Sequence, residues 1–329
     1  GKDETVFKRT IYSLNWIPVG GFVKIKGESG EAQGDNDSFA TRKIWQRALM
    51  LSAGVIMNVV LAAGILSLGF MLGLPSVVDD EPPAGAIVRD REIQVLSVLK
   101  GSPAAEAGLV SSDIIRRIDG RDFTFTRDVQ EYVSGRENQE TEFIIDRQGA
   151  ELTKKITPIK LAETPHGGGI GIGLADVGLV SYPFHIAIWR GTQSAVFLTG
   201  EVIMAFGELI KNLVVRQEVA VDLSGPVGIA VLTGRAVRMG FTYLLQFTAF
   251  LSINLAVVNF LPFPALDGGR VLFLILEKIR RRPVSVKIEN AVHSIGFALL
   301  MVLVVLITYR DLARASGQII GGIKKLIGV

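Results

Sequence analysis

Three long runs without a charged residue constrain the fold more than any other feature of this sequence. They cover residues 48–78, 240–266 and 291–309. Each run is close to or longer than the about 20 apolar residues that a helix needs to cross the hydrocarbon core of a bilayer. The overall hydrophobic fraction of 49% agrees with this, because it is concentrated in these blocks. The sequence therefore predicts a multi-pass α-helical membrane protein.

Basic residues mark one side of the expected membrane. Arg42, Lys43 and Arg47 precede the first run, and a basic segment at residues 277–290 separates the second run from the third. Because positive residues favour the cytoplasmic side, these ends are expected inside the cell, and residues 79–239 outside it. The membrane thus accounts for the net charge of +3, which does not indicate a nucleic-acid partner.

The outer segment contains a β-rich domain, which we expect at residues 83–161. A strand at residues 93–98 leads to a short helix at residues 103–107, which Gly108 ends. A second strand then closes at an Asp-Gly turn at residues 119–120. Small residues and turns in this order predict a compact sheet domain inserted between membrane helices.

Residues 162–239 are expected to form a glycine-rich linker and then a long helix. From residue 184 to residue 212 the apolar faces are broad, and the polar residues fall within a sector of about 80° when the helix advances 100° per residue. We expect this helix to lie along the membrane surface or against the other membrane helices. The polar stripe consists of Arg190, Gln193, Glu201, Glu208 and Lys211.

The second uncharged run leads into a cluster of polar and helix-breaking residues. Pro262 and Pro264 remove helical hydrogen bonds, so the helix must break there. Asp267 follows at or near membrane depth, where a carboxylate must face a polar cavity, a partner or a metal. A polar site at this break is one interpretation. The alternative is an interfacial helix end with a capping aspartate.

This cluster resembles a known protease element. Residues 259–269 read N-x-x-P-x-P-x-L-D-G-G and look like the corresponding element of the site-2 intramembrane metalloproteases. The resemblance implies that Asp267 is the carboxylate ligand of a catalytic Zn²⁺. It also implies that Asn259 and Asn254 line the substrate cleft as catalytic-site residues, with Asn259 steadying the developing oxyanion or the substrate backbone.

Other stretches resemble the same family in the same order. Residues 17–24 are similar to its membrane-associated β-hairpin, residues 54–58 to its second membrane helix, and residues 223–229 to the loop before its third. Residues 83–161 resemble a PDZ domain of the bacterial protease type, which implies peptide binding by strand addition. The implied substrate-binding residues are Ile17, Pro18, Gly20, Gly21, Phe22, Val23 and Asn58.

The family's H-E-x-x-H motif does not occur in this sequence. There are three histidines, none with that spacing, and no cysteine that could supply a thiolate ligand. The resemblance therefore implies a zinc site with Asp267 as the only ligand present and two histidines expected upstream of Gly1. Either the chain is a fragment that is itself inactive, which we expect, or it is a natural pseudoprotease. His166, His185 and His293 are expected to be structural or solvated.

The resemblance implies a zinc-dependent endopeptidase of the bacterial inner membrane, with its PDZ domain outside the cytoplasm. Its substrates would be membrane-anchored regulatory proteins or signal-peptide remnants, which the PDZ domain would filter. The alternatives are a non-catalytic PDZ-bearing membrane binding protein and a transporter, which the lack of a repeat disfavours. The expected boundaries are 1–47 (β-hairpin region), 48–78 (membrane helix), 83–161 (PDZ), 162–239 (linker and helix), 240–276 (membrane helix with the N-x-x-P-x-P-x-L-D-G-G element), 277–290 (basic loop), 291–309 (membrane helix) and 310–329 (tail).

Overall fold

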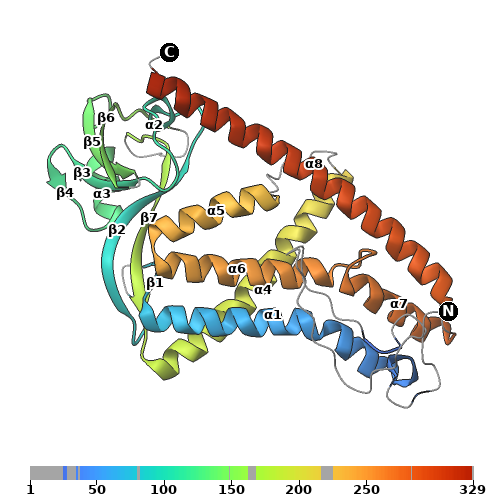
Figure 1. The fold of residues 1–329 in the computed structure, drawn as a ribbon. Coiled ribbons are helices and arrows are strands. Elements are labelled where there is room, and N and C mark those ends of the chain that lie inside the picture. The colour runs from blue at the N-terminus through green and yellow to red at the C-terminus, as the bar shows by residue number, and fades with distance from the viewer. Residues whose placement is uncertain are drawn as a thin grey trace.

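The computed structural model describes residues 25–27, 35, 38–79, 82–147, 149–161, 168–215, 225–282 and 284–327. The expected substrate-binding hairpin lies outside these residues, and with it Ile17, Pro18, Gly20, Gly21, Phe22 and Val23. The described chain has a helical part and a sheet domain at one end of it (Figure 1). A 3₁₀ turn at Phe39–Thr41 precedes the first helix.

Long apolar helices make up the larger part of the molecule. In Figure 1, α1 and α6 run side by side, and α8 runs obliquely along one side of the helical part. The helices are α1 (Ile44–Leu72), α4 (Phe184–Val215), α5 (Pro226–Met239), α6 (Phe241–Phe260), α7 (Asp267–Arg280) and α8 (Val286–Ile327).

Four described segments are long and apolar enough to cross a membrane: Ile44–Leu72, Phe184–Asn212, Phe241–Phe260 and Val286–Ala313. The segment in α4 joins the three that the uncharged runs predict. Only 6% of the most apolar stretch of Val286–Ala313 is buried inside the protein. A helix that is apolar all round and yet exposed is typical of a lipid-facing span. The chain is therefore a multi-pass membrane protein.

Small residues bring α1 and α4 close together. A Cβ atom at Gly191 would collide with Ser67, whose hydroxyl donates to the carbonyl of Ala63 at 2.7 Å. Small residues allow such close approach of helix backbones in membranes. At Gly54, by contrast, a Cβ would meet no atom of another described segment within 4 Å. The close contact thus lies nearer to the C-terminal end of α1.

The sheet domain is antiparallel, with strand order β1-β7-β2-β3-β5-β6 and β4 paired to β3. Helices α2 (Pro103–Glu106) and α3 (Thr126–Ser134) complete it. Its core contains fully buried apolar side chains from several strands and α3, among them Val95, Ile118, Val129, Phe143 and Ile145. The strands are β1 (Leu74–Val77), β2 (Ile87–Val98), β3 (Ile114–Ile118), β4 (Arg121–Asp122), β5 (Thr141–Arg147), β6 (Ala150–Ile156) and β7 (Ile172–Ser181).

Local features of this domain agree with the sequence. Ser102 caps α2 by accepting a hydrogen bond from the N–H of Ala105, and Pro103 is its first residue. Gly108 follows α2 with a φ of +74°, and Asp119 and Gly120 both have positive φ at the turn between β3 and β4. These are the cap and the turn that the sequence predicts.

The sheet extends beyond the segment expected to form it. Strand β7 lies in residues 162–239, where we expected a linker, and it pairs with β2 on one edge and with β1 on the other. Strand β1 directly follows α1, and β7 directly precedes α4. Two paired strands therefore connect the sheet domain to the membrane helices.

Candidate functional site

The break between α6 and α7 is the first candidate site. Helix α6 ends at Phe260 and α7 begins at Asp267, so the chain leaves helical geometry at Pro262 and Pro264, as their ring chemistry requires. Two glycines follow Asp267. A Cβ at Gly268 would collide with the carbonyl of Phe260, and one at Gly269 with that of Phe263. The D-G-G sequence therefore lets α7 fold back tightly on the loop.

Asp267 is half-buried at the first position of α7. No described residue forms a hydrogen bond or an ion pair with its side chain. A carboxylate beside apolar helices is costly unless a partner or a metal compensates it. Its position therefore favours a ligand-binding role.

The three asparagines singled out from the sequence lie on α6 and α1. Asn254 donates a hydrogen bond to the carbonyl of Phe250 within α6. Asn259 lies five residues later, about 140° further around the helix axis, so the two do not share one face. Asn58 lies on α1, where its carbonyl accepts a hydrogen bond from Ser252 at 2.9 Å. The fold thus brings Asn58 beside α6 at Ser252, which precedes Asn254 by two residues.

The residues in the described part of the chain do not complete a metal site. No group of three or more His, Asp or Glu side chains gathers there. His293 approaches the loop, but its Nδ1 accepts a hydrogen bond from the N–H of Ala265 at 2.9 Å. Asp267 therefore remains a single candidate ligand, and the described residues alone do not fit a zinc ion.

An apolar cavity of about 580 Å³ adjoins this loop. Four helices, α1, α4, α6 and α7, line it, and Pro262 and Gly268 bring it to the residues around Asp267. The lining is almost entirely apolar, so the cavity suits a hydrocarbon side chain rather than a charged ligand. Its other lining residues include Val55, Val59, Ile203, Phe206, Val257 and Val271.

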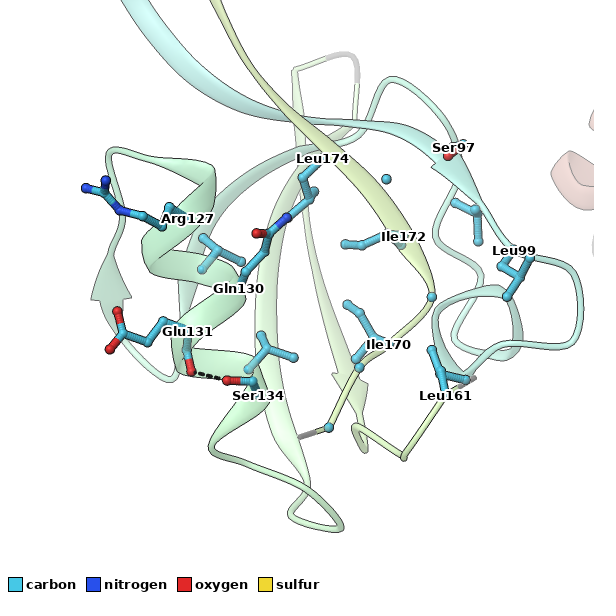
Figure 2. Close-up of a pocket in the computed structure, with 17 residues that line it drawn as sticks. Ser97, Leu99, Arg127, Gln130, Glu131, Ser134, Leu161, Ile170, Ile172 and Leu174 are labelled. Atoms are coloured by element: carbon cyan, nitrogen blue, oxygen red, sulfur yellow. Dashed lines mark hydrogen bonds between the residues drawn. The ribbon is translucent and has the colours of Figure 1, made fainter. Parts of the chain in front are cut away.

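A groove of about 820 Å³ in the sheet domain is the second candidate site (Figure 2). It lies between α3 and the start of β7, and residues 97–99 at the end of β2 also line it. Figure 2 shows Ile170 and Ile172 extending from the chain toward α3, and Gln130 reaching toward Leu174. Apolar side chains therefore form the floor, and the helix forms one wall.

The edge of β7 that faces this groove has room for another strand. Strand β1 occupies that edge only along Val177–Val180, and the N–H of Val78 donates to the carbonyl of Asp176. Residues 172–175 pair only with β2 among the described strands. An edge strand with one free side is the template for strand addition.

The groove ends in a glycine-rich turn at residues 168–171. The carbonyls of Ile170 and Gly171 accept hydrogen bonds from Ala104 and Leu99, while no described residue accepts from their N–H groups. Gly171 has a φ of +75°, and a Cβ there would collide with Ser102. Only glycine fits at this position.

The sequence contained a signal for this groove that we did not use. Residues 167–173 alternate glycine and isoleucine in their second half, which is the period of a strand with one apolar face. Their high glycine content favoured a linker instead. Glycine in a strand also marks a close approach of another backbone or a ligand.

Comparison with known proteins identifies the family. The model of peptidase family M50 matches residues 4–303. The chain belongs to peptidase family M50. This is the family of the site-2 intramembrane metalloproteases, so the membrane helices and the D-G-G loop belong to one known architecture.

Curated relatives in this family are similar to the chain over most of its length. Zinc metalloprotease RasP from Bacillus licheniformis is 34% identical over 89% of the chain, and the chain spans 65% of that relative. Regulator of sigma-W protease RasP from Bacillus subtilis is also 34% identical, with 65% of its length covered. A putative zinc metalloprotease from Clostridium perfringens is 34% identical over 92% of the chain and 84% of its own length.

Solved structures of single domains match about a quarter of the chain. The PDZ domain of the SdrC-like protein Lmo2051 from Listeria monocytogenes is 24% identical, covering 27% of the chain and 92% of its own length with a TM-score of 0.25. The second domain of the Listeria protein Lin2157 is 25% identical, covering 26% of the chain and 86% of its own length with a TM-score of 0.24. The M50 chain thus combines apolar helices with an antiparallel sheet domain.

Proposed function

We propose that this chain carries the carboxylate metal ligand, part of the substrate cleft and the peptide-recognition groove of a zinc-dependent endopeptidase. The enzyme would cut membrane-anchored proteins within or beside the bilayer. The observation that carries the proposal is Asp267, half-buried at a proline-broken helix end and without a described partner, in a chain of family M50. A polar site at membrane depth serves function rather than stability.

Asp267 would supply one ligand to the zinc ion. The other ligands would come from outside the described residues, because no group of three or more His, Asp or Glu side chains gathers among these. Zinc acts in proteases as a Lewis acid that activates water and polarises a carbonyl. We assign Asn259 and Asn254 to the catalytic site. The residues that we assign to substrate binding are Asn58, Ile17, Pro18, Gly20, Gly21, Phe22 and Val23.

The groove in the sheet domain would hold an extended peptide as an added strand on β7. The free edge at residues 172–175 supports this, because a peptide there can form main-chain hydrogen bonds. The two N–H groups of Ile170 and Gly171 would meet the end of the peptide. The segment would belong to a membrane-anchored substrate, so the groove would act as a filter for substrates already trimmed outside the membrane.

The location that we propose is a bacterial inner membrane, with the sheet domain outside the cytoplasm. The basic residues of the α1 entry and of the loop before α8 support it. A relative from Bacillus subtilis bears the name of a sigma-W regulator protease. By analogy, membrane-anchored regulatory proteins or signal-peptide remnants are the substrates to test first.

Asp267→Asn in the full-length protein tests the metal assignment. The expected result is loss of bound zinc and of cleavage of a membrane-anchored substrate, because an amide is a poor zinc ligand. Asp122→Asn, at an exposed position on β4, is the control and should leave both unchanged. Unchanged zinc content together with retained cleavage in the Asp267→Asn protein overturns the assignment.

A second function is supported by the free edge of β7, because peptide binding there needs no metal ion. The chain would then be a non-catalytic membrane protein whose groove binds peptides. The discriminating measurement is peptide binding beside zinc content in the full-length protein. Saturable peptide binding with no zinc and no cleavage in the unmodified protein supports this second function against the first.

A further inference from the structure

In the loop between α6 and α7, most backbone N–H groups find a local acceptor, but one does not. Two of its six residues, Pro262 and Pro264, have no N–H group, which leaves four donors. Three of these find acceptors inside the loop or at the end of α6: Leu261 bonds to Val258, Phe263 to Leu261, and Leu266 to Phe263.

The fourth donor is Ala265, and its acceptor comes from another helix. Its N–H donates to Nδ1 of His293 on α8, with 2.9 Å between the two nitrogens. Without this imidazole the N–H would be partly buried with no local acceptor, which costs more than an exposed donor would. One side chain of α8 therefore completes the hydrogen bonding of the whole loop.

Ala265 also has an unusual backbone conformation. Its φ is +82°, in the left-handed region that a residue with a Cβ rarely adopts. Such a conformation persists only where surrounding structure enforces it. The chain changes direction here and enters α7 two residues later, at Asp267. The geometry of Ala265 thus sets the direction in which α7 leaves the loop.

Helix α8 is packed tightly enough against the loop to hold this geometry. A Cβ at Gly296, one turn after His293, would lie 2.6 Å from the carbonyl oxygen of Pro264. The ring of His293 also packs beside Phe273 of α7, with 5.7 Å between the ring centres. His293 therefore touches the residues on both sides of Asp267, and it does so on the face of α8 that carries Gly296.

We propose that His293 is a positioning residue: its hydrogen bond to Ala265 holds the loop in the conformation that presents the Asp267 carboxylate. The imidazole is neutral in this role, since Nδ1 must be unprotonated to accept and the ring proton is on Nε2. The consequence for catalysis rests on the proposed function of Asp267. The consequence for the conformation of the loop rests only on the hydrogen bond between Ala265 and His293.

Two substitutions separate hydrogen bonding from packing. His293→Asn keeps an acceptor atom at the position of Nδ1 and loses the ring, whereas His293→Phe keeps a ring beside Phe273 and loses the acceptor. Ser294→Ala, at an exposed neighbouring position, is the control. The full-length protein is reconstituted in lipid nanodiscs. Thermal unfolding of each variant is measured first, and only variants that are folded are compared.

The first readout is hydrogen exchange of the peptide that contains Ala265, which needs neither zinc nor substrate. Exchange should rise about tenfold in His293→Phe, as loss of one hydrogen bond predicts, and stay near the unmodified rate in His293→Asn. The second readout is cleavage of a membrane-anchored substrate, which should fall about tenfold in His293→Phe and be rescued in His293→Asn.

The opposite order, with His293→Phe unchanged and His293→Asn impaired in both readouts, assigns the residue to packing and overturns the proposal. So does equal protection of Ala265 in both variants. If either variant does not fold, the ¹⁵N chemical shift of the imidazole in the unmodified protein decides, since a protonated Nδ1 contradicts the bond. Asp267→Asn is measured in parallel. Retained cleavage there refutes the proposed function, while the exchange data still decide the role of His293.

Discussion

Asp311 of α8 holds the first turn of α5 through Gly225: its Oδ2 atom lies 2.9 Å from the Gly225 nitrogen. The same oxygen accepts a second hydrogen bond, from Gly228 at 2.8 Å. The carboxylate is buried, so the two bonds and the positive end of the helix dipole are what make its charge tolerable there. The last membrane helix is thereby fixed to the helix that precedes α6.

Asp311→Ala should destabilise the helical part by about 1.5–3 kcal/mol, because two N–H groups lose a charged acceptor. The measurement is thermal or denaturant unfolding in nanodiscs, followed by circular dichroism. Asp311→Asn keeps one acceptor oxygen and should lie between the alanine variant and the unmodified protein. Equal stability of all three proteins would contradict a stabilising role for these two hydrogen bonds.

Two glycines of α5, one at its N-cap and one inside the helix, should respond in opposite directions to alanine. At Gly225 a Cβ would lie 2.7 Å from Ile307, so Gly225→Ala should separate α5 from α8 and lower stability. At Gly234 only the end of Arg238 would lie within 4 Å, at 3.8 Å. Gly234→Ala should therefore stabilise by about 0.5–1 kcal/mol through helix propensity. Unfolding of the two variants under one set of conditions checks the difference in sign.

The groove should close when a side chain is added at Gly171. Gly171→Ala combines a left-handed φ with a clash against Ser102, and we expect at least a tenfold loss of peptide binding, about 1.4 kcal/mol. Gly149→Ala is a matched control, because it has a φ of +83° but nothing within 4 Å. It should lower stability without weakening binding. Fluorescence anisotropy with a labelled peptide gives the comparison, and equal losses in both variants argue against the groove.

An ion pair with one buried partner should be essential to the sheet domain. Asp113 is fully buried, and Arg147 donates to both of its carboxylate oxygens at 2.7 and 2.8 Å. Arg147→Met leaves that charge without its partner and should cost about 3–5 kcal/mol. Hydrogen exchange of β3 and β5, on either side of the pair, reports the loss. Arg127→Met, on the exposed face of α3, is the control and should change exchange little.

The same domain should lose a little stability in acid. Arg116, which donates to Asp146, holds the pKa of that carboxyl below its usual range, and the N–H of Gly149 lowers it further. A folded-state pKa below the unfolded value of about 3.9 gives stability that is present above pH 4 and lost as pH falls through the folded pKa. The pair is partly exposed, so the contribution should stay below about 1 kcal/mol. Asp146→Asn should remove this part of the pH dependence in denaturant unfolding, and an unchanged profile would falsify the assignment.

Much of the membrane architecture was predictable because it depends on local sequence. Uncharged length predicts a span, and two prolines predict the break before Asp267 wherever the helix lies. The placement of α4 was harder to predict. Its polar stripe fits both a surface helix and a helix packed on neighbours, and only its contacts with α1 and α6 decide between them.

Long-range pairing could not be predicted in the same way. Strand β1 pairs with β7 about a hundred residues later in the chain, and no local pattern carries that register. The hydrogen bond between Ala265 and His293 also depends on the rotation of α8 about its own axis. The pattern of apolar residues does not define that rotation in a lipid-facing helix that is apolar all round. The motif predicted Asp267 as a candidate ligand. Only the three-dimensional structure showed that the described residues do not complete a metal site around it.

Strand β1 places a length requirement on whatever binds in the groove. It has four residues, which span about 13 Å at the rise of an extended chain, and it separates the end of α1 from the point where the free edge of β7 begins. A bound strand would pair with β7 in line with β1. Its pairing would have to stop at Val78, because the N–H of Val78 already bonds to β7. A chain anchored in the same bilayer therefore needs a stem of at least four or five extended residues before its first paired residue, and shorter stems could not reach the groove.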